Sequence, residues 1–250
     1  MITAYHRPQT LDEALALLTQ PNTLPLGGGT LLSKPTADSI EAVDLQALGL
    51  DSLNKTGNNL ELGATLTLQA LLESENCPKA LKSALKLEAP LNIRNAATVA
   101  GTLVACDGRS TFASLLLAMD AKITINSKQK AEETINIGDF LPLRGQILGK
   151  LITKIIIPIN VKLAFEYVSK TPADKPLVCA ALAQWNSGRT RLALGGYGKS
   201  PMLAMDGTES EGVEAAARNA FHEAADEWAS AEYRMDVAAT LAKRCLDSLA

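Results

Sequence analysis

The sequence contains few of the residues that bind metals or carry out catalysis by themselves. Among its 250 residues are two histidines and four cysteines, and aromatic residues make up 4%. The cysteines are far apart and form no C-x-x-C pair; they are Cys77, Cys106, Cys179 and Cys245. Such spacing does not favour an iron–sulfur cluster, and two histidines do not favour a metal site. We therefore expect no metal site and no catalytic residue set, and thiols kept reduced in a cytoplasm.

Charge and hydropathy exclude two further classes of partner. The net charge is −3 and no cluster of Lys and Arg interrupts the sequence, so a nucleic-acid partner is not expected. No apolar run approaches the roughly 20 residues of a membrane-spanning helix. Residues 1–8 contain no apolar core of a secretory signal. The sequence predicts a cytoplasmic protein without a membrane span, made of one large domain or two to three small ones.

Two phosphate-binding motifs are also missing. The sequence has neither G-x-G-x-x-G nor G-x-x-x-x-G-K-[ST], which disfavours the Rossmann and P-loop modes. It has instead three consecutive glycines, Gly27–Gly29, followed by Thr30. Glycine loses more backbone entropy on folding than other residues, so this run indicates a positive φ or a close approach to the main chain. Exposed N–H groups in such a turn can bind phosphate, although a plain turn explains this stretch equally well on its own.

A second segment of small residues, Thr98–Thr102, lies in the next α/β stretch. A pyrophosphate needs several N–H donors and small residues on both sides, so two converging segments are stronger evidence than one. No Ser-His-Asp set and no nucleophile elbow stands out. Any chemistry in which this chain takes part must therefore come from a cofactor.

Hydrophobic periodicity and chain breakers predict a mixture of helices and strands. Thr10, with Glu13 three residues later, is typical of a helix start, and Thr67 is a second candidate cap. The predicted helices are 10–19, 66–73, 78–87, 112–119, 213–225 and 235–249. The predicted strands are 24–26, 42–45, 60–64, 122–125 and 151–158, while 163–168, 177–185 and 190–195 are strand-like or short helical. The segment 92–103 shows no regular period.

Motifs spread over nearly the whole chain occur together and in order. They are Tyr5–Pro8, Leu11–Leu18, Leu26–Leu32, Ile93–Leu103, Phe165–Tyr167, Leu192–Gly196 and Ser230–Arg234. This set resembles the FAD-binding subunits of molybdenum hydroxylases, the family of the carbon monoxide dehydrogenase medium subunit and the xanthine dehydrogenase flavin domain. Within it, Thr98–Leu103 is similar to the family's T-[IV]-G-G-N-[IL] loop.

The resemblance implies an α+β fold in three parts. Residues 1–57 and 58–159 would be two α/β subdomains that form a PCMH-type FAD-binding cleft. Residues 160–250 would be an α+β domain that ends in helices and covers the isoalloxazine ring. In the family two loops hold the FAD pyrophosphate and ribityl chain. By position, the implied cofactor-binding residues are Leu26, Gly27, Gly28, Gly29, Thr30, Leu31, Thr98, Val99, Ala100, Gly101, Thr102 and Asp107.

Four residues depart from the family pattern. Leu31 stands where the family usually has a polar residue, and Thr102 replaces an asparagine. Ala100 replaces a glycine, which adds a methyl group where the backbone would approach the ligand or take a positive φ. Thr111 stands where many members have an acidic residue that faces the ribityl chain. Together these departures weaken the expectation of tight FAD binding, but not the expectation of the fold.

Several other residues have two open interpretations. Two segments could face the flavin or could be plain surface. They are the turn Asp107–Arg109 and the loop that contains Lys170 and Asp174. Arg94 is expected to be structural, and Tyr233 with Arg234 to pack and cap the last helix. Trp185 and Trp228 are expected in the core or at an interface.

The sequence therefore predicts the flavoprotein subunit of a molybdopterin-dependent hydroxylase or dehydrogenase. Its cofactor would be FAD, and molybdopterin and two [2Fe–2S] clusters would belong to a large and a small partner subunit, in a dimer of heterotrimers. Electrons would pass through FAD to an external acceptor, and the chain alone would not act on substrate. The alternative is a structural or assembly subunit that keeps the fold without FAD. A free-standing oxidase of the vanillyl-alcohol-oxidase type is disfavoured, because no histidine or cysteine is placed for covalent flavin attachment.

Overall fold

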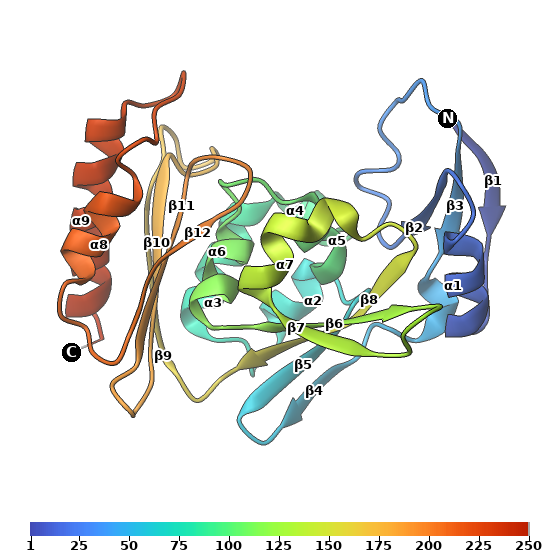
Figure 1. The fold of residues 1–250 in the computed structure, drawn as a ribbon, viewed down its shortest axis with the longest axis horizontal. Helices are drawn as coiled ribbons and strands as arrows, with labels where there is room; N and C mark the ends of the chain where they lie inside the picture. Colours follow the sequence, from blue (N-terminus) through green and yellow to red (C-terminus); the bar gives the residue numbers. More distant parts are fainter. Residues whose placement is uncertain (250) are drawn as a thin grey trace. The chain divides into compact units, whose positions relative to one another are not determined.

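The computed structural model describes residues 1–249, which form two compact units. The first unit comprises residues 1–74, 91–105 and 122–157; the second comprises 75–90, 106–121 and the chain from Pro158 onward. Figure 1 shows the helices and strands of both. Because each unit is assembled from three separate stretches, its core joins residues that are far apart in the sequence.

The first unit contains a three-stranded parallel sheet that carries the glycine run at one strand end. The strand order is β1 (Ile2–His6), β3 (Ile40–Asp44) and β2 (Thr23–Leu26). Helix α1 (Leu11–Leu18) buries an apolar face that packs together with residues of β3. The Thr10 hydroxyl accepts a hydrogen bond from the Glu13 N–H at 3.2 Å, so the predicted helix start is confirmed. Strand β2 ends at Leu26, directly before the glycines.

The first unit also contains a five-stranded sheet, and the second small-residue segment begins one of the helices of this unit. Its strand order is β4 (Leu53–Thr56), β5 (Asn59–Gly63), β8 (Lys150–Pro158), β6 (Lys122–Ser127) and β7 (Glu133–Asn136). The helices and turns of this unit besides α1 are α2 (Leu68–Glu73), α4 (Leu91–Arg94), α5 (Val99–Ala105), α7 (Ile137–Leu143), η1 (Gln46–Leu48) and η2 (Arg144–Gln146). Thr98 thus directly precedes α5.

The second unit is an antiparallel meander between two pairs of helices. The strand order is β12 (Met202–Gly207), β11 (Thr190–Gly195), β10 (Val178–Gln184) and β9 (Lys162–Val168). Helices α8 (Val213–Ala220) and α9 (Ala231–Asp247) cover one face, and α3 (Lys79–Glu88) and α6 (Thr111–Ala118) cover the other (Figure 1). Every residue of α6 is buried, because this helix lies inside the unit.

The residues of β10 alternate between the two faces of this sheet. Val178, Ala180 and Leu182 join the apolar core formed with α8 and α9. On the opposite face Cys179 touches α6, where its sulfur lies 3.6 Å from the Ser114 hydroxyl oxygen. Small side chains on that face allow α6 to approach the sheet closely.

Most predicted elements are confirmed, and the α+β class with them. Thr67 caps α2, and the three stretches left open between strand and helix are the strands β9, β10 and β11. The segment 92–103, for which no element was predicted because it shows no regular period, contains most of the helices α4 and α5. The last helix begins at Ala231, earlier than predicted, because Ser230 caps it by accepting from the Tyr233 N–H.

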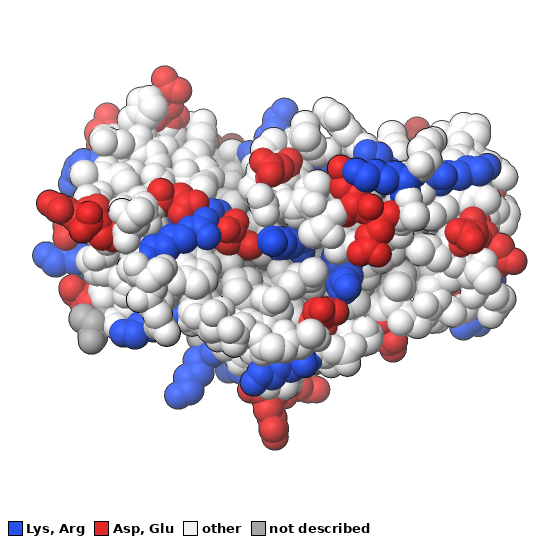
Figure 2. Space-filling view, turned by 60° about the horizontal axis from the view of Figure 1, so that its bottom comes forward, with Lys and Arg blue, Asp and Glu red and all other residues white. Residues whose placement is uncertain are grey.

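The three predicted domain ranges remain predictions. The boundary at 57/58 falls inside the β4–β5 hairpin, and the second unit includes α3 and α6 in addition to residues after 158. No helix within residues 1–249 is long and apolar enough to cross a membrane. On the face drawn in Figure 2, basic and acidic side chains are interspersed.

Candidate functional site

The glycine run forms an open turn between β2 and a single helical turn. The Gly29 carbonyl accepts a hydrogen bond from the Ser33 N–H at 3.0 Å, and Leu31 accepts from Lys34 at 3.1 Å. Among the three glycines, only Gly29 has a positive φ, of 72°. A left-handed backbone is therefore needed at one position of the run, and the other two glycines need another explanation.

That explanation is a close approach of two segments within the first unit. A Cβ atom at Gly28 would lie 1.5 Å from the carbonyl oxygen of Ala96, and one at Gly27 would lie 3.0 Å from the Thr98 hydroxyl oxygen. The distance at Gly28 is impossible for a real Cβ atom, and the distance at Gly27 is tighter than most real Cβ contacts. The structure thus brings the two segments of small residues together, as expected of a shared site.

The turn presents N–H groups that the fold does not use. Among the described residues, no acceptor takes a hydrogen bond from the N–H of Gly27, Gly28, Gly29, Thr30 or Leu31. Most are partly exposed, and the Leu31 side chain is 52% exposed. Successive N–H groups without acceptors form a concavity suited to an anion such as phosphate.

The second segment differs, because its N–H groups already have partners. Val99 donates to the Leu66 carbonyl at 2.9 Å and Ala100 donates to that of Ala64 at 3.2 Å. The Gly101 N–H donates to the Thr98 hydroxyl at 3.1 Å, so that Thr98 caps α5. From Val99 to Thr102 the segment therefore provides a wall of small residues whose backbone donors are already used.

Two of the departures from the family pattern are explained by this geometry. Ala100 lies in the first turn of α5 and has no positive φ, so its methyl group causes no backbone strain. The Thr102 hydroxyl donates to the Thr98 carbonyl at 2.8 Å within the same helix. Neither position needs the residue usual in the family for the fold to form.

Thr111 is the departure with the largest structural consequence. It lies fully buried in the second unit, and its hydroxyl donates to the Ala84 carbonyl at 2.7 Å. The Glu88 carboxylate lies 3.1 Å from the same hydroxyl and also accepts from Ser110 and from the Phe112 N–H. An acidic group is thus present at the start of α6, but it comes from α3. Nothing in the sequence singles out Glu88, because no local pattern links it to residues more than twenty positions away.

Asp107 belongs to the second unit and is engaged in a turn. Its carboxylate accepts from the Arg109 N–H at 2.9 Å and pairs with the Lys175 ammonium at 3.0 Å. The neighbouring Gly108 is enclosed by backbone, since a Cβ there would lie 1.8 Å from the Tyr197 carbonyl oxygen. A glycine is required at 108 for this close packing.

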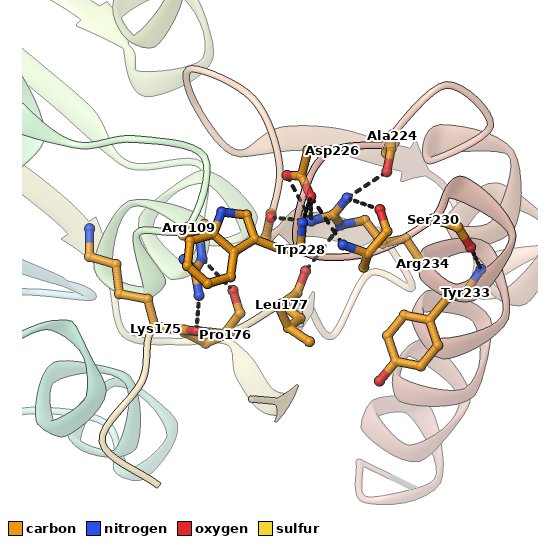
Figure 3. A network of polar contacts seen from close by, with 12 residues as sticks. Arg109, Lys175, Pro176, Leu177, Ala224, Asp226, Trp228, Ser230, Tyr233 and Arg234 are labelled. Carbon is orange, nitrogen blue, oxygen red and sulfur yellow. Dashed lines mark hydrogen bonds and ion pairs between the residues drawn. The ribbon is translucent and has the colours of Figure 1, made fainter. Parts of the chain in front are cut away.

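A buried arginine organises the other polar network of the second unit (Figure 3). Arg234 has no exposed surface; its guanidinium donates to both oxygens of Asp226 at 2.8 and 2.9 Å and to the Ala224 carbonyl at 2.7 Å. Burial alone would raise the pKa of Asp226. The hydrogen bonds from Arg234 and from two backbone N–H groups outweigh burial and hold that pKa below its usual range. The expected packing role of Arg234 is confirmed.

Two residues with open interpretations meet at the edge of this network. The Arg109 guanidinium lies 5.2 Å and the Lys170 ammonium 4.7 Å from the centre of the Trp228 ring. Trp228 is 46% exposed, so of its two expected places the core is excluded, and an interface stays a prediction.

The described residues contain no group of three His, Cys, Asp or Glu that could hold a metal ion. All four cysteines are buried, and burial raises the pKa of the Cys77, Cys179 and Cys245 thiols to about 12. Thiols with such pKa values are not nucleophiles at neutral pH.

Comparisons with known proteins agree with this geometry. A family model described as the FAD binding domain in molybdopterin dehydrogenase matches residues 1–160. The uncharacterized protein YgfM of Escherichia coli K12 is 29% identical over 250 aligned residues, which cover 96% of this chain and 94% of YgfM. The glyceraldehyde dehydrogenase medium chain of Sulfolobus acidocaldarius is 27% identical over 223 residues, covering 81% of this chain and 78% of that protein.

Among solved structures, a chain of reconstituted CO dehydrogenase from Oligotropha carboxidovorans matches with a TM-score of 0.84 and 23% identity, covering 98% of this chain and 96% of that one. A structural match at this identity establishes the fold.

Proposed function

Because the chain belongs to the family of FAD-binding domains of molybdopterin dehydrogenases, we propose that it is the FAD-binding electron-transfer subunit of a molybdopterin-dependent hydroxylase or dehydrogenase. Family membership confirms the resemblance found in the sequence. The single observation that carries the proposal is the row of N–H groups from Gly27 to Leu31 that lacks acceptors among residues 1–249. Such a donor set fits a pyrophosphate, since oxyanions are held by several backbone N–H groups at once.

The two loops would divide the binding of FAD between them. Gly27–Leu31, which follows Leu26, would donate to the pyrophosphate through its N–H groups and the Thr30 hydroxyl. Thr98–Thr102 would line the cofactor with small side chains, because the N–H groups from Val99 to Thr102 are used within the unit. Asp107 would accept from a cofactor hydroxyl, since a carboxylate has acceptor capacity beyond its Arg109 and Lys175 partners.

The proposed partners are a large molybdopterin-binding subunit and a small [2Fe–2S] subunit, assembled as a dimer of heterotrimers in the cytoplasm. The printed name of one relative, the medium chain of a glyceraldehyde dehydrogenase, supports a multi-chain assembly. The four buried cysteines, none of them in a disulfide within the described chain, are typical of a reducing compartment.

Bound FAD would supply the exchange of electrons between the iron–sulfur clusters of the small subunit and an external acceptor. The residues of this chain would hold and orient the cofactor and keep water from it. Oxidation of the substrate would take place in the large subunit, so the isolated chain would not turn over substrate.

The second candidate is a structural or assembly subunit without FAD. One specific observation favours it: the N–H groups of Val99, Ala100 and Gly101 are used within the fold, which leaves one loop to bind the pyrophosphate. Leu31 offers no polar side chain, and Thr111 is buried.

The visible absorption spectrum of the complex, purified with its partner subunits and desalted, separates the two candidates. A flavin band that persists, with one FAD per copy of this chain after acid release, supports the electron-transfer subunit. Iron–sulfur bands without flavin, in a complex that contains this chain, would overturn that proposal in favour of the assembly role.

A further inference from the structure

Trp228 lies half exposed at the surface of the second unit, on a backbone that is tied to the interior. Its backbone N–H donates to the Asp226 carboxylate at 2.8 Å, and Asp226 is anchored by the buried Arg234 (Figure 3). The Arg109 guanidinium beside the ring is held by the carbonyls of Lys175 and Pro176. An aromatic surface with an anchored backbone and an anchored guanidinium beside it is therefore exposed on this unit.

The two cations at this ring have no carboxylate partner among the described residues. Asp107 pairs with Lys175, and Asp226 pairs with Arg234, so these two carboxylates are engaged with other cations. The Lys170 ammonium contacts the ring and no other group of residues 1–249. Two positive charges that share one aromatic ring repel each other, and an anion placed between them would relieve that repulsion.

We propose that Arg109, Lys170 and Trp228, which all belong to the second unit, form a binding site for a free nucleotide. The phosphate would pair with Lys170 and with the remaining guanidinium nitrogen of Arg109. The base would stack on Trp228 after the flexible Lys170 side chain moves from the ring to the phosphate. A nucleotide fits this site because its planar base can stack on the indole and its phosphate can pair with the two cations.

The composition of the chain makes this site measurable. Trp185 and Trp228 are the two tryptophans of the sequence. In a Trp185→Phe background, tryptophan fluorescence therefore reports on Trp228 alone. ADP is the probe, and adenosine and inorganic pyrophosphate test the ring and the phosphates separately. Calorimetry repeats the ADP titration with excess FAD, so that binding of ADP at a flavin site is identified.

We expect ADP to quench Trp228 saturably, to bind more tightly than adenosine or pyrophosphate, and to bind equally well with excess FAD. Lys170→Gln should raise the Kd by about tenfold, because it removes one charge-assisted contact to the phosphate. Lys128→Gln, which changes the same charge at an exposed turn, should leave the Kd unchanged. Trp228→Leu, followed by calorimetry, should reduce the affinity to that of pyrophosphate.

Three results would overturn the proposal. The first is absence of saturable quenching at millimolar ADP. The second is equal binding by the Lys170→Gln and Lys128→Gln variants, or pyrophosphate that binds as tightly as ADP. The third is ADP binding that excess FAD abolishes, which would place the nucleotide at the flavin site. The first two results concern ADP and pyrophosphate binding and can be obtained even if the chain binds no FAD. Failure of the nucleotide site can therefore be distinguished from failure of the proposed function.

Discussion

Gly28 lies against the carbonyl oxygen of Ala96, at a distance that leaves no space for a side chain: a Cβ at position 28 would be 1.5 Å from that oxygen. Ala96 follows helix α4 and precedes Thr98, the residue that caps α5. The conformation of the glycine turn and the start of α5 are therefore coupled through this contact and through that of Gly27 with Thr98. Glycine at 28 is required by the neighbouring backbone and not by its own φ.

The variant Gly28→Ala tests this coupling. We expect the methyl group to push the two segments apart, to lower the free energy of unfolding by about 1–3 kcal/mol, and to weaken FAD retention. Urea unfolding and the flavin content after desalting measure the two effects. Gly145→Ala is the matched control, since a Cβ there meets no atom within 4 Å. Equal stability and equal flavin content in the two variants would contradict the coupling.

The Asp226 carboxylate should make stability depend on pH in the acid range. Its native pKa lies below the usual value, because the hydrogen bonds from Arg234 and two backbone N–H groups outweigh the opposing effect of burial. The stabilisation is complete above the pKa of an aspartate in the unfolded chain, about 3.9, and is lost as the pH falls through the lower native pKa of Asp226.

Asp226→Asn should reduce the free energy of unfolding at pH 7 by about 2 kcal/mol, since Arg234 loses its counter-ion but keeps carbonyl partners.

The same variant should also flatten the decline of stability below about pH 4. Urea unfolding at a series of pH values measures both effects. Asp51→Asn, at an exposed position outside regular structure, serves as the control for the loss of one carboxylate. If the stability profiles of the Asp226 and Asp51 variants coincide, Asp226 does not contribute in this way.

Local features of the sequence predicted local features of the fold. Thr10 and Thr67 precede apolar helical periods, and both cap helices because a hydroxyl satisfies an N–H group three residues later. The glycine run likewise predicted a turn with a close approach, since no other residue type tolerates one. These predictions needed information from a few neighbouring residues.

Hydrogen bonds between distant segments could not be predicted in the same way. The carbonyls of Ala64 and Leu66 take the N–H groups at the start of α5, and nothing near Val99 in the sequence indicates this. The position of Trp228 at the surface follows from its anchoring by Asp226, which follows in turn from the buried Arg234. Tryptophan in a sequence favours the core on average, and this specific network overrides the average.

The close packing of α6 on the second sheet can be tested at Gly195. A Cβ there would lie 2.5 Å from the Ser114 hydroxyl oxygen and 2.8 Å from the Cys179 sulfur. Gly195→Ala should therefore lower the free energy of unfolding by about 1–3 kcal/mol. Removing the Ser114 hydroxyl in the double variant with Ser114→Ala should recover part of this loss, although the single Ser114→Ala variant loses a hydrogen bond to Ser110. A double-mutant cycle that shows strict additivity would exclude direct contact as the cause.

The last prediction concerns the buried Thr111, where an acidic residue is usual in the family that the sequence resembles. Thr111→Asp would place a second carboxylate next to Glu88, which lies 3.1 Å from the Thr111 hydroxyl. Two carboxylates this close, one of them at a fully buried position, repel each other strongly when both are ionised, so ionising both would cost stability. We expect the free energy of unfolding to fall by about 3 kcal/mol or more, with no gain in flavin content.

Two further variants identify the cause of that loss. Thr111→Ser keeps the hydroxyl that donates to the Ala84 carbonyl and should lose much less stability. In the double variant with Glu88→Gln the repulsion is absent, so it should be more stable than Thr111→Asp alone. Urea unfolding at pH 7 ranks the variants, and flavin content after desalting is measured on the same samples. A stable Thr111→Asp protein with increased flavin content would mean that position 111 opens toward the cofactor and that Glu88 does not occupy the place of the family's acidic residue.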